Sequence, residues 1–397
     1  MKVSNRILSY RHSPIRKLSP ISDKVEEKGV KVYHLNIGQP DIKTPKEAIE
    51  AIKSFDKDLI NYGDSAGHLD LRKSLVDYYS KYNVNITPEN LVITTGGSEA
   101  LLFVFQTLCD EGSETIIPEP YYTNVSTFAK MAQTKLVPIS SSIENDFSLP
   151  DLKELEKKVT DKTRAILLCN PNNPTGYIYS KEELKGILDF CKKHKLFLIV
   201  DEVYREFCYD SKKFVSILSF KGYEDLCVCV DSFSKRFSMC GARVGSLISR
   251  NPEIIDNVMK LAQARLCPPD IEQIAANAAL KAPSSYLKKV TEEYQKRRDF
   301  IFEALNKIPG IKCNRPKGAF YLVAQLPVDD AEDFSLFLLR DFKYKNQTVM
   351  LAPAAGFYAT EGMGKNQVRI AYVLNIEDLK NAVDCLARGL KAYQEKQ

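Results

Sequence analysis

The sequence predicts an α/β protein in which a mostly parallel sheet flanked by helices forms a large domain, accompanied by a smaller α+β domain. From about residue 90, short β-rich runs alternate with amphipathic helical stretches, which is typical of βαβ units. With 397 residues and 44% hydrophobic composition, the chain is too long for a single hydrophobic core of ordinary size, so two domains are expected. A long polar helical stretch at 284–307 carries few apolar residues, as expected for a helix that bridges two domains.

The elements of the large domain are predicted in the order strand, turn and helix. Each expected strand is a short apolar run, as in strands that are buried on both faces. The expected strands cover residues 91–94, 165–169, 196–200 and 226–230. A helix is expected at 99–109, and another begins after Ser180, where Glu183 completes a capping box.

The C-terminal part of the chain predicts the smaller domain. Strands are expected at 320–323 and 368–373, with a helix near 334–342 and a closing helix. The N-terminal segment before residue 45, which contains the turn-rich stretch 36–41, is expected to pack with this unit. The predicted division is residues 45–284 for the large domain, and residues 1–44 with 285–397 for the small domain.

Composition excludes several classes of partner. Basic and acidic residues are interleaved at a net charge of +5, so no basic stripe follows a nucleic-acid backbone. No apolar run approaches the length of a membrane span, and residues 1–20 lack the apolar stretch of an export signal, which predicts a cytoplasmic protein without membrane contact. The ten cysteines and four histidines lack metal-ligand spacing, so reduced thiols and no metal site are expected.

Two turns that follow expected strands offer polar groups to a ligand. Gly96, Gly97 and Ser98 precede a helix, so free backbone amides can approach an anion there, although a tight structural turn uses the same glycines. In the segment 170–176, two prolines and a terminal glycine fix the backbone and hold Asn173 at a strand end. A rigid turn without a ligand is the alternative for this segment.

Four further side chains suit charged or polar ligands. Asp201 ends an apolar strand, where a buried carboxylate needs a cationic partner or forms a structural salt bridge. Tyr204 follows in the next turn and serves either as a phenol donor or as a packing residue. Arg243 lies among small residues that let a phosphate approach, and Arg369 lies in an apolar alternation typical of an arginine that binds a carboxylate.

Lys235 comes just after the strand 226–230, at the sheet edge where ligands bind in α/β proteins. A protonated lysine is a poor nucleophile, and the cationic neighbours Arg236 and Arg243 would favour its neutral form. Taken alone, a lysine at a strand end is more often a solvated surface residue.

Together these motifs meet the needs of a pyridoxal phosphate site: a lysine that bonds to the cofactor, a carboxylate at the ring nitrogen, donors to the ring oxygen and a phosphate cup. The segments 170–176, 201–204 and 232–235, with Arg243 eight residues on, resemble the class I aminotransferases. The resemblance runs from about Ser13 to the C-terminal helix, and Gly-Gln-Pro-Asp at 38–41 is similar to the aspartate aminotransferase branch. It implies the pyridoxal-phosphate-dependent transferase fold of type I and a homodimer with shared active sites.

The resemblance also implies a role for individual residues. Lys235, Asp201 and Tyr204 are the implied catalytic residues, with Lys235 as the covalent anchor of the cofactor and the carrier of a proton. Asp201 would hold the ring nitrogen protonated, while Asn173 and Tyr204 would donate to the ring oxygen. Tyr122 would stack on the ring. The implied phosphate ligands are Gly97, Ser98, Ser232, Arg243 and Tyr62 of the partner subunit. The implied ligands of the substrate α-carboxylate are Arg369, Asn173 and the Gly38 backbone.

The implied reaction moves the amino group of an L-amino acid, aspartate, to a 2-oxo acid, 2-oxoglutarate, by a ping-pong mechanism. Ser98 stands where some dicarboxylate-specific relatives have a lysine. Arg265 is the candidate replacement, reaching across the dimer, and an ordinary helix-terminal arginine is the alternative.

Other functions fit the same motifs. They are an aminotransferase for alanine, aromatic or other neutral amino acids, a β-C–S lyase, a cyclopropane-forming synthase, and a non-catalytic scaffold without cofactor. A ligand-sensing regulator on this fold would need a DNA-binding segment, for which the N-terminal stretch is too short.

Overall fold

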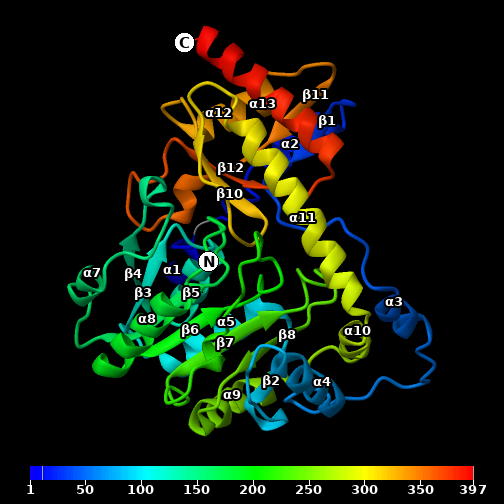
Figure 1. The fold of residues 1–397 in the computed structure, drawn as a ribbon, viewed down its shortest axis with the longest axis vertical. Coiled ribbons are helices and arrows are strands. Elements are labelled where there is room, and N and C mark those ends of the chain that lie inside the picture. Colours follow the sequence, from blue (N-terminus) through cyan, green and yellow to red (C-terminus); the bar gives the residue numbers. More distant parts are fainter. Residues whose placement is uncertain (11, 397) are drawn as a thin grey trace.

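The computed structural model describes residues 1–10 and 12–396. A seven-stranded sheet forms the centre of the larger part of the molecule, with the strand order β2-β8-β7-β6-β5-β3-β4 (Figure 1). Its strands are β2 (Leu91–Thr94), β3 (Glu114–Glu119), β4 (Lys135–Ser140), β5 (Thr163–Cys169), β6 (Phe197–Asp201), β7 (Cys227–Ser232) and β8 (Gly245–Ile248). Only β8 runs antiparallel to its neighbours, β2 and β7. The predicted mostly parallel sheet is therefore confirmed.

Three of these strands, β3, β4 and β8, were not predicted from the sequence. Glutamates begin and end β3, and Pro118 interrupts its apolar run. The edge strand β4 mixes polar residues with Pro138, and β8 begins with Gly245 and Ser246. Edge strands and glycine-rich strands lack the continuous apolar pattern that identifies a central strand.

Helices cover both faces of the large sheet (Figure 1). They include α5 (Gly96–Leu108), which packs on β7 and β8, and α8 (Lys181–His194), which packs on β6. The predicted capping box at the start of α8 is confirmed, because the Ser180 hydroxyl accepts from the Glu183 amide at 3.1 Å and the Glu183 carboxylate accepts from the Ser180 amide at 2.7 Å. Helix α5 begins at Gly96, so both adjacent glycines lie in its first turn.

The smaller domain joins the two ends of the chain. Strand β1 (Lys31–His34) pairs in parallel with β11 (Gln347–Met350), and a second sheet has the order β12-β13-β10-β9. Its strands are β9 (Lys312–Cys313), β10 (Tyr321–Gln325), β12 (Ala352–Pro353) and β13 (Gln367–Ala371). The expected packing of the N-terminal segment against the C-terminal unit is confirmed. The boundaries at residues 45 and 284 stay a prediction.

Four helices belong to this smaller domain or reach into it. They are α2 (Ser19–Glu26), α11 (Ser284–Leu305), α12 (Ala331–Arg340) and α13 (Ile376–Lys396). In Figure 1, α11 (yellow) runs from the neighbourhood of α10 (Asp270–Leu280) up to α13, so it spans both parts of the molecule as expected.

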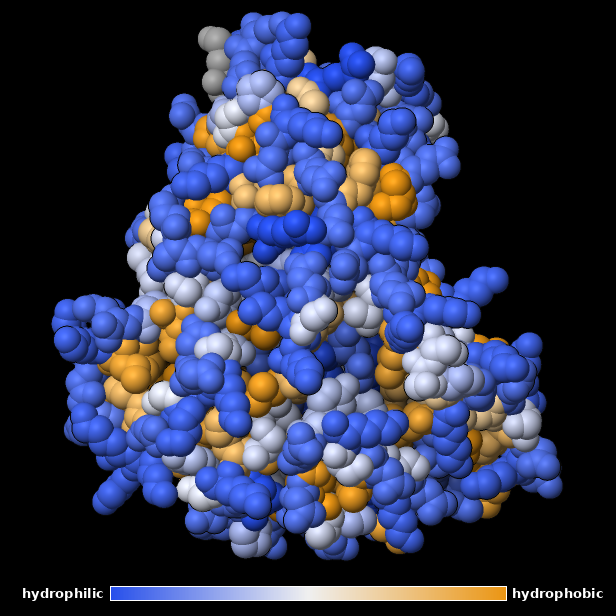
Figure 2. All heavy atoms as spheres, in the orientation of Figure 1, coloured by the Kyte–Doolittle hydropathy of each residue, from blue (hydrophilic) through white to orange (hydrophobic). Residues whose placement is uncertain are grey.

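The surface has no continuous apolar belt on the face drawn in Figure 2, where hydrophobic residues form separate small areas among hydrophilic ones. Within residues 1–10 and 12–396, no helix is long and apolar enough to cross a membrane.

Candidate active site

A cavity of about 500 Å³ lies at the carboxyl ends of β5, β6 and β7, below the smaller domain. This is the edge at which the sequence placed its ligand site, because parallel strands end together there. The cavity brings together most of the predicted site residues: Gly38, Gly97, Ser98, Tyr122, Asn173, Asp201, Tyr204, Ser232, Lys235, Arg243 and Arg369. Tyr62 and Arg265 do not line it.

Lys235 follows β7 by three residues and is partly buried in the cavity. Its ammonium donates a 2.8 Å hydrogen bond to the Gly38 carbonyl, and Nζ lies 3.9 Å from the Cys240 sulfur. Because Gly38 follows β1, this bond joins the end of the large sheet to the smaller domain. The alternative of a solvated surface lysine is therefore wrong for Lys235.

Arg236 has a different position from the one expected of a cationic neighbour to Lys235. Its guanidinium is fully buried and donates to Asp231 at 2.7 Å. Asp231 also accepts from the Tyr79 hydroxyl at 2.7 Å and pairs with Arg205 at 3.6 Å. The expected electrostatic effect of Arg236 on Lys235 is thus corrected, because a buried carboxylate compensates the charge of Arg236.

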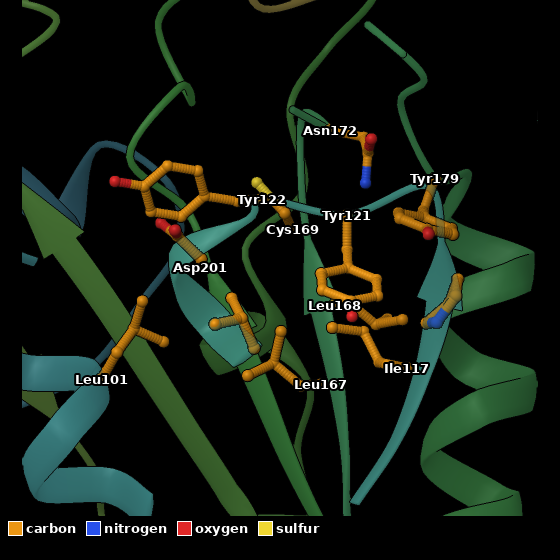
Figure 3. Close-up of a pocket in the computed structure, with 12 residues that line it drawn as sticks. Leu101, Ile117, Tyr121, Tyr122, Leu167, Leu168, Cys169, Asn172, Tyr179 and Asp201 are labelled. Carbon is orange, nitrogen blue, oxygen red and sulfur yellow. The ribbon is translucent and has the colours of Figure 1, made fainter. Parts of the chain in front are cut away.

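Asp201 lies at the end of β6, where one carboxylate oxygen accepts from the Val203 amide at 3.1 Å. Burial of the carboxyl group raises its pKa to about 7, although the Val203 bond acts in the opposite direction. No salt bridge forms between Asp201 and any residue in the described part of the chain. In Figure 3 the ring of Tyr122 lies beside this carboxylate, and both face a small pocket lined by apolar residues such as Leu101.

Arg369 crosses from β13 to the cavity and begins a chain of hydrogen bonds. One guanidinium nitrogen donates to the Asn173 side-chain oxygen at 3.2 Å, and another donates to the Asn36 carbonyl. The Asn173 amide then lies 3.4 Å from the Tyr204 hydroxyl, which is 3.0 Å from the Tyr321 hydroxyl. Asn173 and Tyr204 therefore meet beside Asp201 as expected from their strand ends.

Arg369 has no acidic partner among the described residues, although its side chain is almost completely buried. Burial lowers its pKa from the usual value, and the Nε atom has no hydrogen-bond partner. The rings of Tyr321 and Phe357 lie 4.5 and 5.0 Å from its guanidinium carbon. A buried arginine held between aromatic rings and polar oxygens is suited to a carboxylate ligand.

A polar cup lies at the N-terminus of α5. The Ser232 and Ser234 hydroxyls are 2.8 Å apart, and Arg243 donates to the Cys240 carbonyl at 2.9 Å. Gly96 has φ +74°, and a β-carbon there would collide with the guanidinium of Arg243. A glycine at this position therefore lets the arginine lie directly against the helix terminus, where free amides and a positive charge favour an anion.

Tyr62 and Arg265 lie elsewhere on the subunit. Tyr62 is 80% exposed, on the extended segment between α3 (Lys46–Lys53) and α4 (Leu69–Ser80). Arg265 ends α9 (Pro252–Arg265) and donates to the backbone carbonyls of Ser65 and Ile93, at 3.1 and 3.3 Å. Arg265 therefore does not reach the cavity of its own subunit.

Several residues that line the cavity were not predicted from the sequence to belong to a site: Ser13, Ile15, Arg16, Gln39, Asn124, Ser234, Cys240 and Tyr321. Gln39 and Ser234 adjoin residues that were identified, and Asn124 donates to the Tyr122 hydroxyl at 2.8 Å. The N-terminal residues gave no local signal, because only the tertiary fold brings them to the sheet. The described residues contain no group of three or more His, Cys, Asp and Glu side chains that could hold a metal ion.

Comparisons with known proteins show the family of the chain. Residues 30–386 match the family of class I and II aminotransferases. The chain is 34% identical to an aspartate aminotransferase of Pyrococcus horikoshii, over 98% of this chain and 97% of the relative. It is 32% identical to aromatic-amino-acid aminotransferase 2 of Thermococcus litoralis, over 98% and 99%.

Solved structures give the same result. An alanine aminotransferase from Pyrococcus furiosus superposes with a TM-score of 0.90 at 33% identity, covering 98% of this chain and all of that one. An aspartate aminotransferase from Thermus thermophilus, solved with maleate, has a TM-score of 0.89 at 27% identity, with 98% and 100% coverage. The fold is that of enzymes that transfer amino groups. The chain belongs to the class I and II aminotransferases.

Proposed function

We propose that this aminotransferase uses pyridoxal phosphate to move the amino group of aspartate to 2-oxoglutarate by a ping-pong mechanism. The observation that carries the proposal is that Lys235, Asp201 and Arg369 line one cavity and that none has an ion-pair partner among the described residues. Charged groups with little access to water are unfavourable unless they are paired. The cavity therefore suits a ligand that supplies one cationic and several anionic groups.

The polar groups of the cavity fit pyridoxal phosphate. The raised pKa of Asp201 suits a carboxylate whose cationic partner, the ring nitrogen, arrives with the ligand. Asn173 and Tyr204, which lie 3.4 Å apart, would donate to the oxygen of the cofactor ring. The Tyr122 ring lies beside Asp201 and would stack on the cofactor ring (Figure 3). When bound, the cofactor supplies a reactive carbonyl and a ring that withdraws electrons from the substrate α-carbon.

The cup at the start of α5 fits the cofactor phosphate. Gly97 and Ser98 supply amides in the first turn of α5, Ser232 supplies a hydroxyl, and Arg243 supplies a guanidinium. We assign the remaining phosphate ligand to Tyr62 of the partner subunit, because Tyr62 is exposed on its own subunit.

Lys235 has two tasks in this proposal. Its amino group would anchor the cofactor covalently. The same amino group, once free, would accept the proton from the substrate α-carbon and return it during the reaction. The Gly38 carbonyl accepts a hydrogen bond from Nζ at 2.8 Å and holds this amino group near the carboxyl end of β7.

Arg369 orients the substrate. Its guanidinium binds the α-carboxylate, and the Asn173 side chain, which already accepts from it, completes the contact. A side chain at Gly38 would collide with the Tyr321 hydroxyl, so only the backbone of Gly38 would contact the substrate.

Aspartate as donor is supported by relatives from Pyrococcus horikoshii and Bacillus subtilis that are named aspartate aminotransferases. An alanine or aromatic amino acid donor is the second candidate, because other relatives carry those names. Arg265 is left with a role only in the cavity of a partner subunit. A β-C–S lyase would cleave its substrate and would not reload the cofactor with an oxo acid.

We further propose a cytoplasmic homodimer. Leu59, Ile60 and Tyr62 are all more than half exposed on one segment, which supports contact with a second subunit. All ten cysteines are free, which supports a reducing compartment.

The test is borohydride reduction of the purified enzyme with pyridoxal phosphate, followed by peptide mapping and a donor screen. We expect the cofactor label on Lys235, and amino-group transfer that is fastest with aspartate and 2-oxoglutarate. Label on another lysine would overturn the assignment of Lys235. Faster transfer from alanine or phenylalanine would select the second candidate, and release of ammonia and a thiol would identify the lyase.

A further inference from the structure

We propose that Arg16 recognises the side-chain carboxylate of the substrate and thereby selects dicarboxylic amino and oxo acids. This inference rests on the proposed function, because it assigns a residue to the substrate specificity of the same cavity. Arg16 lines the cavity from the N-terminal segment, together with Ser13 and Ile15.

The residues on either side of Arg16 fix that segment in place. The Asn36 side-chain amide donates to the Ile15 carbonyl at 2.9 Å. Lys17 forms a salt bridge with Glu332 of α12, and Leu18 is buried in a small apolar cluster with Val32. Because its neighbours are held by the smaller domain, Arg16 is fixed at the backbone while its side chain extends to the cavity.

Asn36 also connects Arg16 to the other carboxylate site. Its carbonyl accepts from the guanidinium of Arg369, while its side chain holds the Ile15 carbonyl. Arg16 and Arg369 are thus positioned through one residue, and both line the cavity. Two arginines that line one cavity can hold the two carboxylates of a single substrate.

The charge of the cavity points in the same direction. Among the described residues, four cationic side chains line it, Arg16, Lys235, Arg243 and Arg369, against one carboxylate, Asp201. Lys235 bonds to the cofactor, Arg243 faces the phosphate cup and Arg369 binds the α-carboxylate. Arg16 is left without an anionic partner, and no salt bridge of its side chain is formed within the described part of the chain. A substrate with a second carboxylate supplies that partner, whereas alanine does not.

Arg16 fits this role better than Arg265. Arg265 already donates to two backbone carbonyls, and the Glu99 carboxylate lies 3.8 Å from it. Ser98, which also lines the cavity, is uncharged. Arg16, unlike Arg265, lines the cavity of its own subunit, and unlike Arg369 it has no other assigned partner.

The experiment compares holoenzyme variants Arg16→Gln, Arg16→Lys and Arg265→Gln with the parent, using aspartate, glutamate and 2-oxoglutarate against alanine, phenylalanine and pyruvate. We expect Arg16→Gln to lower kcat/KM for the dicarboxylic substrates about 10-fold or more, the effect of losing one charged hydrogen bond. The monocarboxylic substrates should change less than about 3-fold, and Arg16→Lys should restore part of the loss.

Lys17→Gln is the matched control, because it removes the same charge one residue away, at the salt bridge with Glu332. It should leave the preference for dicarboxylic substrates within about 3-fold of the parent. Dissociation of pyridoxal phosphate is measured in each variant by absorbance. If Arg16 binds the substrate carboxylate, cofactor retention is unchanged in Arg16→Gln, whereas it weakens if Arg16 binds the cofactor phosphate.

Three outcomes would overturn the inference. They are an equal loss for both substrate groups in Arg16→Gln, weaker cofactor retention with an unchanged substrate preference, and a selective loss in Arg265→Gln alone. Absence of amino-group transfer from every donor in the parent would instead refute the proposed reaction. Fast transfer from neutral amino acids only would leave Arg16 without a dicarboxylic substrate and would also overturn the inference.

Discussion

At the scale of single residues, Asp201 and Arg369 are two charged side chains whose surroundings disfavour their charged forms. Burial raises the pKa of Asp201 to about 7 and lowers the pKa of Arg369. A ligand with a cation opposite Asp201 and a carboxylate opposite Arg369 would reverse both effects. Such pairs of unfavourable groups are more common at ligand sites than in structural cores.

Asp201 makes the stability of the cofactor-free protein depend on pH. Its pKa is about 7 in the folded protein and about 4 in the unfolded chain, so between these values the folded state holds the extra proton. The free energy of unfolding therefore falls as pH rises through this window. We expect Asp201→Asn to remove up to about 1.4 kcal/mol per pH unit of this slope, measured by urea unfolding.

The control is Asp189→Asn. The Lys185 ammonium hydrogen-bonds Asp189 and lowers its pKa, so it titrates below this window. That variant should keep the slope of the parent between about pH 5 and about pH 7. If the free energy of unfolding depends on pH with the same slope in the parent and in Asp201→Asn, Asp201 is charged in the cofactor-free protein, and the expectation is wrong.

At the scale of elements, a buried cluster of charges holds three segments together beneath the cavity. Asp231 belongs to β7, Tyr79 to α4, and Arg205 to the turn after β6. Arg205 also pairs with Glu202 at 2.9 Å, and all four side chains are buried. Because Ser232 follows Asp231 directly, this cluster fixes the strand end from which Ser232 and Lys235 reach the ligand.

Removing one charge from the cluster should be costly. Asp231→Asn leaves Arg205 and Arg236 with one carboxylate fewer, and breaking a buried pair in this way costs about 3–5 kcal/mol. Burial raises the pKa of Asp231, but the charges of Arg205 and Arg236 outweigh it and hold the pKa below the usual value, so the contribution is present above about pH 4 and is lost as pH falls further. Urea unfolding at neutral pH measures the effect.

An exposed ion pair provides the comparison. Lys185 and Asp189 lie 2.6 Å apart on the surface of α8, one turn from each other. Asp189→Asn should therefore change the free energy of unfolding by less than about 1 kcal/mol. Similar losses in the two variants would contradict the structural role of the buried cluster.

At the scale of the whole molecule, one subunit has an incomplete cavity in the proposed homodimer. Tyr62 is exposed on the segment between α3 and α4, which extends to the edge of the molecule in Figure 1. If it serves the partner's phosphate cup, the Lys235 of one subunit works with the Tyr62 of the other.

Mixed dimers test this arrangement. We expect Lys235→Ala to abolish activity and Tyr62→Ala to reduce it by weakening retention of the cofactor. When the two are mixed and allowed to exchange subunits, half of the dimers are hybrids with one intact site, so activity should rise to about a quarter of the parent. Activity that stays at the mean of the two separate variants would place Tyr62 outside the partner's site.

Part of this site was predictable because its residues follow recognisable strands. Asn173, Asp201 and Lys235 each come within five residues of the end of an apolar strand, and strands that run in parallel end at one edge. Arg16 and Tyr321 carry no such local signal. Their distance in sequence from β5, β6 and β7 means that only packing of the smaller domain brings them to the cavity.

The sequence by itself determined the family, the mostly parallel sheet and the identity of the central side chains, because short apolar strands and rigid turns depend on local chemistry. Tertiary structure decided the rest. It inserts β8 antiparallel between β2 and β7 and buries Arg236 against Asp231. It also keeps Arg265 out of the cavity of its own subunit and brings Arg16 to that cavity. Each of these depends on contacts between distant segments, and the free energy of such contacts depends on burial and pairing that no local pattern records.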